Sequence, residues 1–270
     1  MPQISILGCG WLGFPLAKSL LKNGFTVKGS TTSTEKVDGF SSAGILPFLI
    51  SLTADGIDGD IESFLRESDI LIIDIPPKLR GENKESFTDK IKMLIPYIET
   101  AGIKNVLFVS STSVYSDDNS VVTEETPAVP ETESGKQLLE SEQLLLQNTN
   151  FKTTVLRFGG LISEDRQPVK FLAGRDNLEN PDGPVNLIHR TDCIGIIEKI
   201  IEKNAWGEIF NGVYPDHPTR EEYYTKKTLS LGLPSPKFNH EKPSNGKAIS
   251  AEKVMIVLGY NFKEALGQDF

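Results

Sequence analysis

Three glycines near the start of the chain are spaced as in loops that bind phosphate groups. The segment Gly8-Cys9-Gly10-Trp11-Leu12-Gly13 has the pattern G-x-G-x-x-G and stands between an apolar run and a helical pattern. In such a loop the first glycine permits a tight turn, the second lets the main chain approach a diphosphate, and the third lets helix and strand pack closely. The helix N-terminus adds unpaired N–H groups and the positive end of a dipole. We therefore predict that this segment binds a pyridine dinucleotide, NAD or NADP, the alternative being a glycine-rich turn without a ligand.

The end of the second predicted strand bears on the choice between NAD and NADP. Sites that prefer NAD usually carry an acidic residue there, which binds the ribose 2′-hydroxyl. Here the strand end offers the hydroxyls of Ser30, Thr31 and Thr32 and a nearby lysine, Lys36, but no carboxylate. Hydroxyls and a cation suit a 2′-phosphate, so the composition favours NADP over NAD. The alternative is that these residues only cap the following helix.

Strand and helix patterns alternate over the first 160 residues, and these elements must position the glycine loop. Such alternation predicts parallel βαβ units and hence an α/β fold of the Rossmann type, with a doubly wound parallel sheet. The expected strands are short apolar runs at Gln3–Leu7, Phe25–Gly29, Leu46–Leu52, Ile70–Ile75, Val106–Ser110 and Thr153–Phe158. The expected helices are Trp11–Lys22, Asp60–Glu67, Lys84–Thr100 and Ser134–Gln147. Pro96 is expected to kink or divide the third of these helices.

The pattern changes after Gly160. Turn formers and charges dominate residues 163–186, and Asp182-Gly183-Pro184 is the clearest turn signal. The expected later elements are helices at Thr191–Lys203, Thr219–Leu231 and Ser250–Leu258 and a strand near Glu208–Tyr214. We predict a dinucleotide-binding domain over residues 1–160. Residues 161–270 should form a small substrate-side cap, interleaved with late strands of the main sheet.

Composition excludes several classes of function. The net charge of -9 disfavours nucleic-acid binding, which needs a basic surface. No apolar run approaches the roughly 18 residues that a membrane-spanning helix requires. The cysteines Cys9 and Cys193 form no C-x-x-C pair, which indicates a reduced, cytoplasmic protein. The three histidines lack metal-ligand spacing, so no metal site is expected.

Four further segments resemble the short-chain dehydrogenase/reductases, in particular extended and atypical members and the nucleoside-diphosphate-sugar epimerase-like group. They are Ile73–Pro77, Val109–Tyr115, Leu156–Leu161 and Val185–Asp192, and they follow the glycine motif in the expected order. The resemblance covers nearly the whole chain and implies an NAD(P)-binding Rossmann protein. It also implies that the cofactor contacts Ile75, Pro76, Ser110, Gly159 and Gly160.

The same resemblance assigns Ser111 to the position of the catalytic serine or threonine. A hydroxyl there can hydrogen-bond the carbonyl or alcohol that gains or loses hydride and hold it near the cofactor. The alternative is a serine at a strand end that satisfies local backbone groups.

The chain departs from the family at the Tyr-x-x-x-Lys pair, in which the tyrosine is the general acid/base and the lysine lowers its pKa. Aligning Glu142 with the family's helix glutamate puts Ser134 at the tyrosine position and Leu138 at the lysine position. Aligning Lys136 with the lysine instead puts Thr132 at the tyrosine position, so neither register recovers the pair. Tyr115 and Lys136 are the substitute candidates. Their alternatives are a packed aromatic ring for Tyr115 and a solvated helix lysine for Lys136.

Basic and polar residues after Gly160 are candidates for the substrate side. Arg166, Lys170 and Arg175 stand in the loop where extended relatives contact the diphosphate of a nucleotide-sugar, and basic side chains there suit a phosphorylated or carboxylated substrate. Scattered surface charge is the alternative for all three. By the same resemblance Asn186 and His189 border the substrate cleft. Asp192 either orients His189 or caps the next helix.

Two functions follow from these observations. The leading hypothesis is an NAD(P)-dependent oxidoreductase, or a nucleotide-sugar epimerase- or dehydratase-like enzyme, that lacks the usual pair and acts on a small molecule, phosphorylated or nucleotide-linked. The alternative is a non-catalytic dinucleotide-binding sensor or scaffold, which the absence of the pair supports. A nucleic-acid-binding regulator is disfavoured by the charge.

Overall fold

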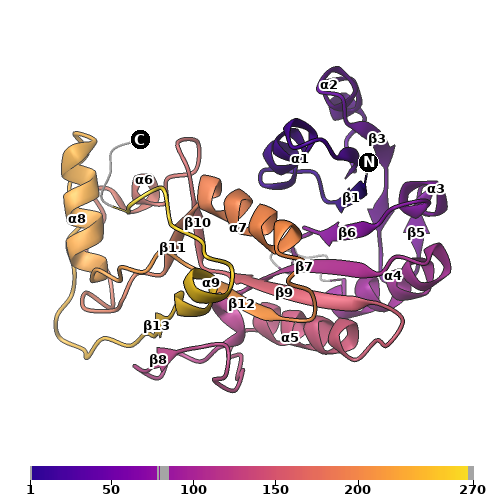
Figure 1. The fold of residues 1–270 in the computed structure, drawn as a ribbon. Helices are drawn as coiled ribbons and strands as arrows, with labels where there is room; N and C mark the ends of the chain where they lie inside the picture. Colours follow the sequence, from indigo (N-terminus) through magenta and orange to yellow (C-terminus); the bar gives the residue numbers. More distant parts are fainter. Residues whose placement is uncertain (1, 78, 80–84, 267–270) are drawn as a thin grey trace.

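The computed structural model describes residues 2–77, 79 and 85–266. Its centre is a sheet of seven parallel strands in the order β12-β9-β7-β6-β1-β2-β3 (Figure 1). The strands are β1 (Gln3–Leu7), β2 (Thr26–Thr31), β3 (Leu46–Leu49), β6 (Ile70–Ile73), β7 (Asn105–Ser111), β9 (Lys152–Phe158) and β12 (Ile209–Gly212). The strand order reverses between β1 and β6, as it does at the switch point of a doubly wound sheet. The predicted Rossmann-type α/β fold is therefore confirmed.

Two helices from distant parts of the sequence cover one face of this sheet. They are α1 (Gly13–Lys22) and α7 (Arg190–Glu202), which contact each other above the strands in Figure 1. Both helices pack on strand residues such as Ile4 and Ile72, which are fully buried. Because successive strand residues point to opposite faces, the neighbour of Ile72, Leu71, packs on the other side.

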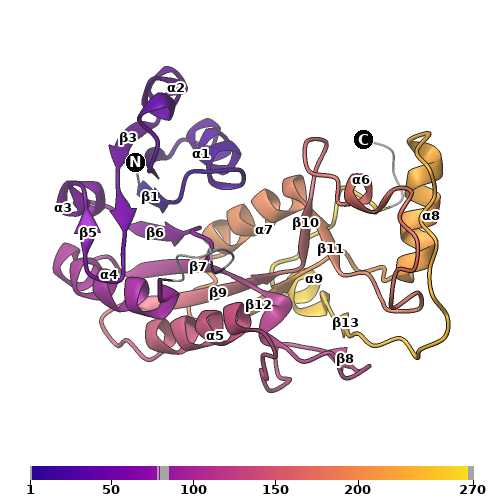
Figure 2. The same cartoon turned by 180° about the vertical axis from the view of Figure 1, so that it is seen from behind.

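The opposite face carries α3 (Ile61–Leu65), α4 (Phe87–Ala101) and α5 (Glu133–Leu146), as Figure 2 shows from behind. Helix α4 continues through Pro96, so the prediction that this residue could divide the helix is wrong. A proline removes one helical hydrogen bond. Leu94 and Ile98, on either side of it, are buried against the sheet and hold the helix together.

Most predicted elements occur with shifted ends, and one strand is broken. The run Leu46–Leu52 divides at Ile50, because β4 (Ser51–Leu52) pairs with the antiparallel β5 (Ile57–Asp58) instead of the main sheet. The short helix α2 (Val37–Ser42) was not predicted. Among its residues only Phe40 is buried, so it has no apolar stripe that the sequence could reveal.

A smaller layer follows β9 at the carboxyl end of the sheet. Strands β10 (Gly160–Ile162) and β11 (Leu187–His189) pair in parallel, and helices α6 (Val169–Leu172) and α8 (Arg220–Ser230) pack together. This layer has its own buried apolar cluster, which includes Val169, Val185, Leu187, Tyr223 and Tyr224. Between these elements the chain returns to the main sheet as α7 and β12. The division at residue 160 stays a prediction.

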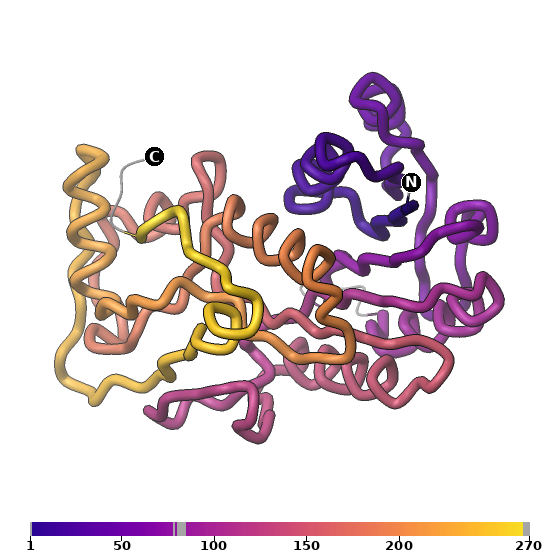
Figure 3. The backbone as a smooth tube through the Cα atoms, viewed as in Figure 1, coloured from indigo at the N-terminus to yellow at the C-terminus, as the bar shows by residue number. Residues whose placement is uncertain are grey.

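The last described residues run back over the molecule. Strand β13 (Ala248–Ile249) pairs with β8 (Val121–Val122), and α9 (Glu252–Val257) packs near β12. The segment after α9, yellow in Figure 3, then passes α7. Buried Asp192 holds this segment: it accepts hydrogen bonds from the Tyr260 hydroxyl at 2.7 Å and the Lys263 N–H at 2.8 Å. Asp192 thus joins the start of α7 to the C-terminal segment, a role that the sequence did not suggest. None of the described helices is both long and apolar enough to cross a membrane.

Candidate functional site

A crevice of about 680 Å³ opens at the carboxyl ends of β1, β2, β6 and β7. Open α/β sheets bind their ligands at this edge, beside the switch point. The predicted site residues that line the crevice are Gly8, Cys9, Gly10, Trp11, Leu12, Ser30, Thr31, Thr32, Ile75, Pro76, Ser110, Ser111 and Arg166. The fold thus brings the glycine loop, the end of the second strand and the two serines to one place.

Gly8 and Gly13 are required by the packing of the protein itself. Gly8 has φ +99, and a Cβ there would lie 2.2 Å from the carbonyl oxygen of Asp74. A Cβ on Gly13 would lie 2.6 Å from the carbonyl oxygen of Gly8. On the other side, Ser30 accepts the N–H of Gly8 on its Oγ at 2.9 Å and the N–H of Cys9 on its carbonyl at 2.8 Å. Ser30 is buried and shapes the turn.

Gly10, unlike Gly8 and Gly13, is not required by the packing of the protein. A Cβ on Gly10 would meet only the carbonyl oxygen of Gly8, at 3.9 Å, so it would project into open space. Within the described residues, the main-chain N–H groups of Trp11 and Leu12 have no protein acceptor. These amides stand at the start of α1, where the helix dipole favours a negative ligand. The loop therefore fits the diphosphate of a dinucleotide.

Cys9 belongs to the glycine loop, and its side chain packs in the hydrophobic core. Its side chain is buried, and burial raises the pKa of the thiol to about 12. The group stays protonated at neutral pH, and a protonated thiol is not nucleophilic.

The crevice continues past β2 towards the end of β3. Thr31 and Thr32 line one side, and Lys36, on the short turn after β2, lies among the same lining residues. Leu52 and Thr53 follow β3 on the other side. In the described structure no acidic side chain from residues 33–69 lines this part of the crevice. The hydroxyls and the cation that the sequence placed here therefore face the ligand space.

Asp74 follows β6 and places a carboxyl group beside the glycine turn. It accepts a hydrogen bond from the N–H of Gly13. Burial raises the pKa of Asp74 to about 8, and the bond from Gly13 opposes this shift only in part. A carboxyl group that keeps its proton at neutral pH does not repel a neighbouring diphosphate.

Ser110 and Ser111 end strand β7 with hydroxyls of opposite hydrogen-bonding roles. The Oγ of Ser110 donates to Glu142 Oε1 at 2.5 Å, so its lone pairs remain for a donor. The Oγ of Ser111 accepts the N–H of Ser113 at 3.2 Å, so its hydrogen remains for an acceptor. The two hydroxyls can thus meet an alcohol and a carbonyl oxygen, respectively.

A network of buried polar side chains holds the hydroxyl of Ser110 in place. Glu142 pairs with Arg157 through two guanidinium nitrogens, with a closest distance of 2.6 Å, and both side chains are buried. Arg157 also donates to the hydroxyl of Tyr115 at 2.6 Å, and that hydroxyl donates to Asn211 Oδ1 at 3.1 Å. Burial raises the pKa of Tyr115, whose ring is 2 % exposed. The structure therefore favours the packed aromatic over the catalytic interpretation of Tyr115.

Helix α5 presents an apolar side chain to the crevice. Leu138, at the lysine position of the family alignment, is one of the lining residues. Lys136 is exposed on the first turn of α5 and does not line the crevice. Gly135 lets this turn approach Ser113, whose carbonyl oxygen would lie 2.4 Å from a Cβ on Gly135. At the lysine position of the family alignment α5 thus presents an apolar side chain and no proton-transfer group.

Other predicted site residues lie where the main sheet meets the cap. A Cβ on Gly159 would lie 2.6 Å from the carbonyl oxygen of Asn186, and one on Gly160 would lie 2.6 Å from Leu187 Cδ2. The side chain of Asn186 bonds the main chain of Lys247 and Ile249. None of these three predicted residues lines the crevice, and buried His189 does not line it either. Instead, His189 Nδ1 accepts the N–H of Thr191 at the start of α7.

Of the three basic residues after Gly160, Arg166 alone lines the crevice. Lys170 and Arg175 are exposed elsewhere on the cap. The main-chain carbonyl of Arg175 accepts the N–H of Lys237 at 2.9 Å, which joins it to the segment after α8.

Comparison with known proteins identifies the family. A protein-family model described as NAD(P)H-binding matches residues 8–192, which is more than half of the chain. The chain belongs to the NAD(P)H-binding family. Protein YeeZ of Escherichia coli strain K12 is 34% identical over 265 residues, which cover 97% of this chain and 96% of YeeZ.

Solved structures of short-chain dehydrogenase/reductases and nucleotide-sugar epimerases share the fold of this NAD(P)H-binding protein. UDP-glucuronic acid 4-epimerase from Bacillus cereus, in complex with NAD, matches with a TM-score of 0.80 at 17% identity over 98% of this chain and 93% of that chain. A short-chain dehydrogenase/reductase superfamily protein from Agrobacterium tumefaciens with bound NAD matches with a TM-score of 0.78 at 18% identity, over 98% and 93%. At such identities the likeness concerns the fold.

Several lining residues of this NAD(P)H-binding protein were missed from the sequence. Leu52 and Thr53 lie at the end of a predicted strand, so the rule that ligands bind at carboxyl strand ends would have found them. Glu85 and Lys90 also line the crevice and pair at 2.5 Å. They belong to the start of α4, where no local pattern marks them. No group of acidic, histidine and cysteine side chains suited to a metal occurs in the described part of the chain.

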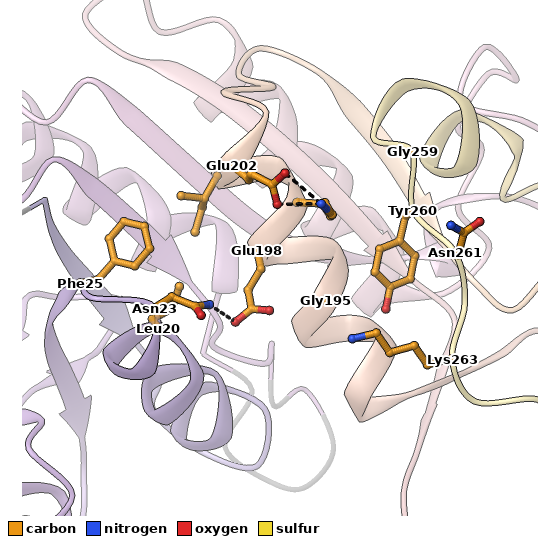
Figure 4. Close-up of a pocket in the computed structure, with 12 residues that line it drawn as sticks. Leu20, Asn23, Phe25, Gly195, Glu198, Glu202, Gly259, Tyr260, Asn261 and Lys263 are labelled. Carbon is orange, nitrogen blue, oxygen red and sulfur yellow. Dashed lines mark hydrogen bonds and ion pairs between the residues drawn. The ribbon is translucent and has the colours of Figure 1, made fainter.

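A second cavity of about 670 Å³ lies between α1, α7 and the C-terminal segment (Figure 4). Its carboxylates are engaged by neighbours: Glu198 accepts from Asn23 Nδ2 at 2.8 Å, and Glu202 pairs with Lys199 at 2.7 Å. The hydroxyl of Tyr260 is bonded as well. These polar groups join three segments of the NAD(P)H-binding fold, so we assign the functional site to the crevice at the strand ends.

Proposed function

We propose that this protein is an NADP(H)-dependent oxidoreductase, or an epimerase- or dehydratase-like enzyme, that lacks the usual tyrosine and lysine. The observation that carries the proposal is the pair Ser110 and Ser111 at the end of β7, which lines the same crevice as the glycine loop. Ser110 offers lone pairs and Ser111 offers a hydrogen. Such a pair can hold both the alcohol and the carbonyl form of a substrate.

The residues that would hold the cofactor follow from the geometry. The amides of Trp11 and Leu12 would bind the diphosphate, and Lys36 with Thr31 and Thr32 would face the adenosine ribose. A lysine at that point favours a 2′-phosphate, and hence NADP. When bound, the nicotinamide supplies or accepts a hydride at C4.

The chain's own contribution is to orient the reacting oxygen. Ser111 would donate its hydrogen to that oxygen, and hydrogen bonds of this kind are most effective when the donor is fixed in advance. Leu138 would exclude water from the wall where the family has its lysine. The substrate is a small molecule, phosphorylated or nucleotide-linked. This is supported by the cation Arg166 at the cap side and by the UDP-sugar epimerase among the neighbours of the fold. A reduced, cytoplasmic setting agrees with the buried thiols of Cys9 and Cys193.

The second candidate is a dinucleotide-binding sensor or scaffold without chemistry. The observation that favours it is Leu138 in the lysine position, since an apolar side chain cannot lower a phenol pKa or bind a ribose.

Titration with NADPH and NADH, followed by nicotinamide fluorescence and calorimetry, tests the shared part of both proposals. We expect both dinucleotides to bind, NADPH the more tightly. Binding of neither would contradict both functions. Turnover of nucleotide-linked sugars with NADP⁺ then separates them: Ser111→Ala should abolish turnover and leave NADPH affinity unchanged. Turnover that Ser111→Ala leaves intact would remove Ser111 from the mechanism, and absence of any turnover would favour the sensor.

A further inference from the structure

The indole ring of Trp11 contacts two arginines of the cap side. The guanidinium carbon of Arg166 lies 5.0 Å from the ring centroid, and that of Arg190 lies 4.9 Å from it. The indole Nε1 donates to Asp165 Oδ1 at 3.1 Å. A residue of the glycine loop is thereby joined to residues more than 150 positions later in the chain. Cation–π contacts of this kind are attractive and hold a guanidinium without consuming its N–H groups.

The two arginines differ in how their charges are compensated. Arg190 pairs with Asp165 at 3.1 Å and with Glu164 at 3.4 Å. A hydrogen bond from Ser163, together with those from Trp11 and Arg190, lowers the pKa of Asp165 to about 2, so the carboxylate is ionised at neutral pH. The charge of Arg190 is therefore neutralised locally, and Arg190 does not line the crevice.

Arg166 lines the crevice beside Gly10 and Trp11, and no ion pair to its guanidinium is found in the described part of the chain. Its main chain is fixed, because Arg166 and Ser163 exchange two hydrogen bonds of 3.1 Å, and Ser163 is fully buried. The side chain is fixed at its far end by the indole. Arg166 thus presents up to five N–H donors in a restrained position in the crevice that Trp11 and Leu12 also line.

We propose that Arg166, held on the Trp11 indole, binds a phosphate group of the ligand in the crevice. The inference rests on the proposed function and adds to it a specific anion-binding arginine. A guanidinium matches the geometry of phosphate oxygens and can bind two of them at once. The amides at the start of α1 and Arg166 then contact the anion from the sheet side and from the cap side. Two phosphate sources share this chemistry: the diphosphate of the dinucleotide and a phosphate on the substrate.

The cap segment 163–166 takes part in binding through this contact. Because Trp11 belongs to the glycine loop and Arg166 to the cap, an anion between them ties the two layers together. Removing the indole should therefore weaken anion binding as much as removing the guanidinium, even though the indole itself makes no bond to phosphate.

The test compares Arg166→Gln with Arg190→Gln, which removes the other arginine that contacts the Trp11 indole. Calorimetry gives the dissociation constants of NADPH and of ADP-ribose, which keeps the diphosphate but lacks the nicotinamide and the 2′-phosphate. A second titration adds UDP to protein saturated with NADPH. Hydrogen bonds to charged groups contribute enough for a change of about tenfold or more. Thermal unfolding of each variant shows that it is folded.

Three outcomes are distinguished. A loss of about tenfold for NADPH and ADP-ribose in Arg166→Gln, with Arg190→Gln within about twofold of wild type, supports the proposal and identifies the dinucleotide diphosphate as the anion. An unchanged NADPH affinity with a similar loss for UDP supports it with a substrate phosphate. Losses in neither titration, or equal losses in both variants, overturn it. If the wild-type protein binds no dinucleotide, the proposed function fails. If the wild-type protein binds and Arg166→Gln keeps its affinity in both titrations, only the inference about Arg166 fails.

The aromatic ring is tested separately. Trp11→Ala should weaken the same ligand to the same extent as Arg166→Gln, and Trp11→Phe, which keeps a ring, should stay within about threefold of wild type. Full affinity in Trp11→Ala would contradict the role of the indole.

Discussion

The Oγ of Ser110 donates to Glu142 Oε1 at 2.5 Å, which connects the wall of the crevice to a buried ion pair. Glu142 in turn pairs with Arg157, and both side chains are buried. The hydroxyl of Ser110 is therefore fixed in one orientation before any ligand arrives. A charged pair in the core costs desolvation free energy. Here it orients a hydroxyl of the ligand site.

Loss of the carboxylate of Glu142 should destabilise the protein strongly. In Glu142→Ala, Arg157 keeps its charge in the core without a partner, and breaking a buried pair in this way costs about 3–5 kcal/mol. Urea unfolding measures the change in the free energy of unfolding. Asp89→Ala is the matched control, because Asp89 pairs with Lys92 on the surface, and exposed pairs contribute at most about 1 kcal/mol. Equal small losses in the two variants would contradict the role given to the buried pair.

The glycine turn should tolerate no side chain at Gly8. An alanine there has an unfavourable positive φ and a Cβ 2.2 Å from a carbonyl oxygen of Asp74. Gly24 also has a positive φ, but nothing lies within 4 Å of its Cβ position. Gly24→Ala should therefore cost about 1–2 kcal/mol through φ alone, whereas Gly8→Ala should cost more and abolish NADPH binding. Unfolding curves and NADPH titration of both variants measure this, and normal binding in Gly8→Ala would be inconsistent with the turn described.

Asp74 should make stability depend on pH. The pKa of Asp74 is raised in the folded protein to about 8 from an ordinary value of 3.8. Between these values the folded chain keeps a proton that the unfolded chain has lost, so the free energy of unfolding contributed by this group falls as pH rises. The contribution is fully present below the lower value and is lost by the upper one. Asp74→Asn, which has no proton to lose, should show a flatter profile in urea unfolding from pH 4 to 8. A profile parallel to that of wild type would rule out this assignment.

Lys36 should determine the preference between the two coenzymes. Lys36→Ala removes the cation that faces the adenosine end of the crevice, so NADPH affinity should fall by about tenfold while NADH affinity changes little. Lys22→Ala, at the exposed last turn of α1, is the control for net charge. The ratio of the two dissociation constants is the quantity to measure. A ratio that moves equally in both variants would show that only the overall charge matters.

The sequence predicts the sheet and the glycine loop well because both depend on local patterns. Apolar runs mark strands that are covered on both faces, and Gly8 and Gly13 are needed by the backbone of the turn itself. The serines at the end of β7 follow from the strand position, and both line the crevice. In such cases a short segment contains the whole physical reason for its structure.

Contacts between distant segments could not be predicted in the same way. Tyr115 ends in a buried network with Arg157 because β7 and β9 are neighbours in the sheet, a fact that no short segment contains. The contact of Trp11 with Arg166 depends on where the cap folds back. Asp192 looked like a helix cap, yet it binds a segment some 70 residues later. Each of these roles is decided by a partner that only the tertiary structure brings close.

A crystal structure of the protein with saturating NADPH tests the central claim most directly. We predict density for the dinucleotide at the carboxyl ends of β1, β2, β6 and β7, with the diphosphate on the amides of Trp11 and Leu12. NADPH bound instead in the cavity between α1, α7 and the C-terminal segment, or a crevice without the dinucleotide at that concentration, would contradict it.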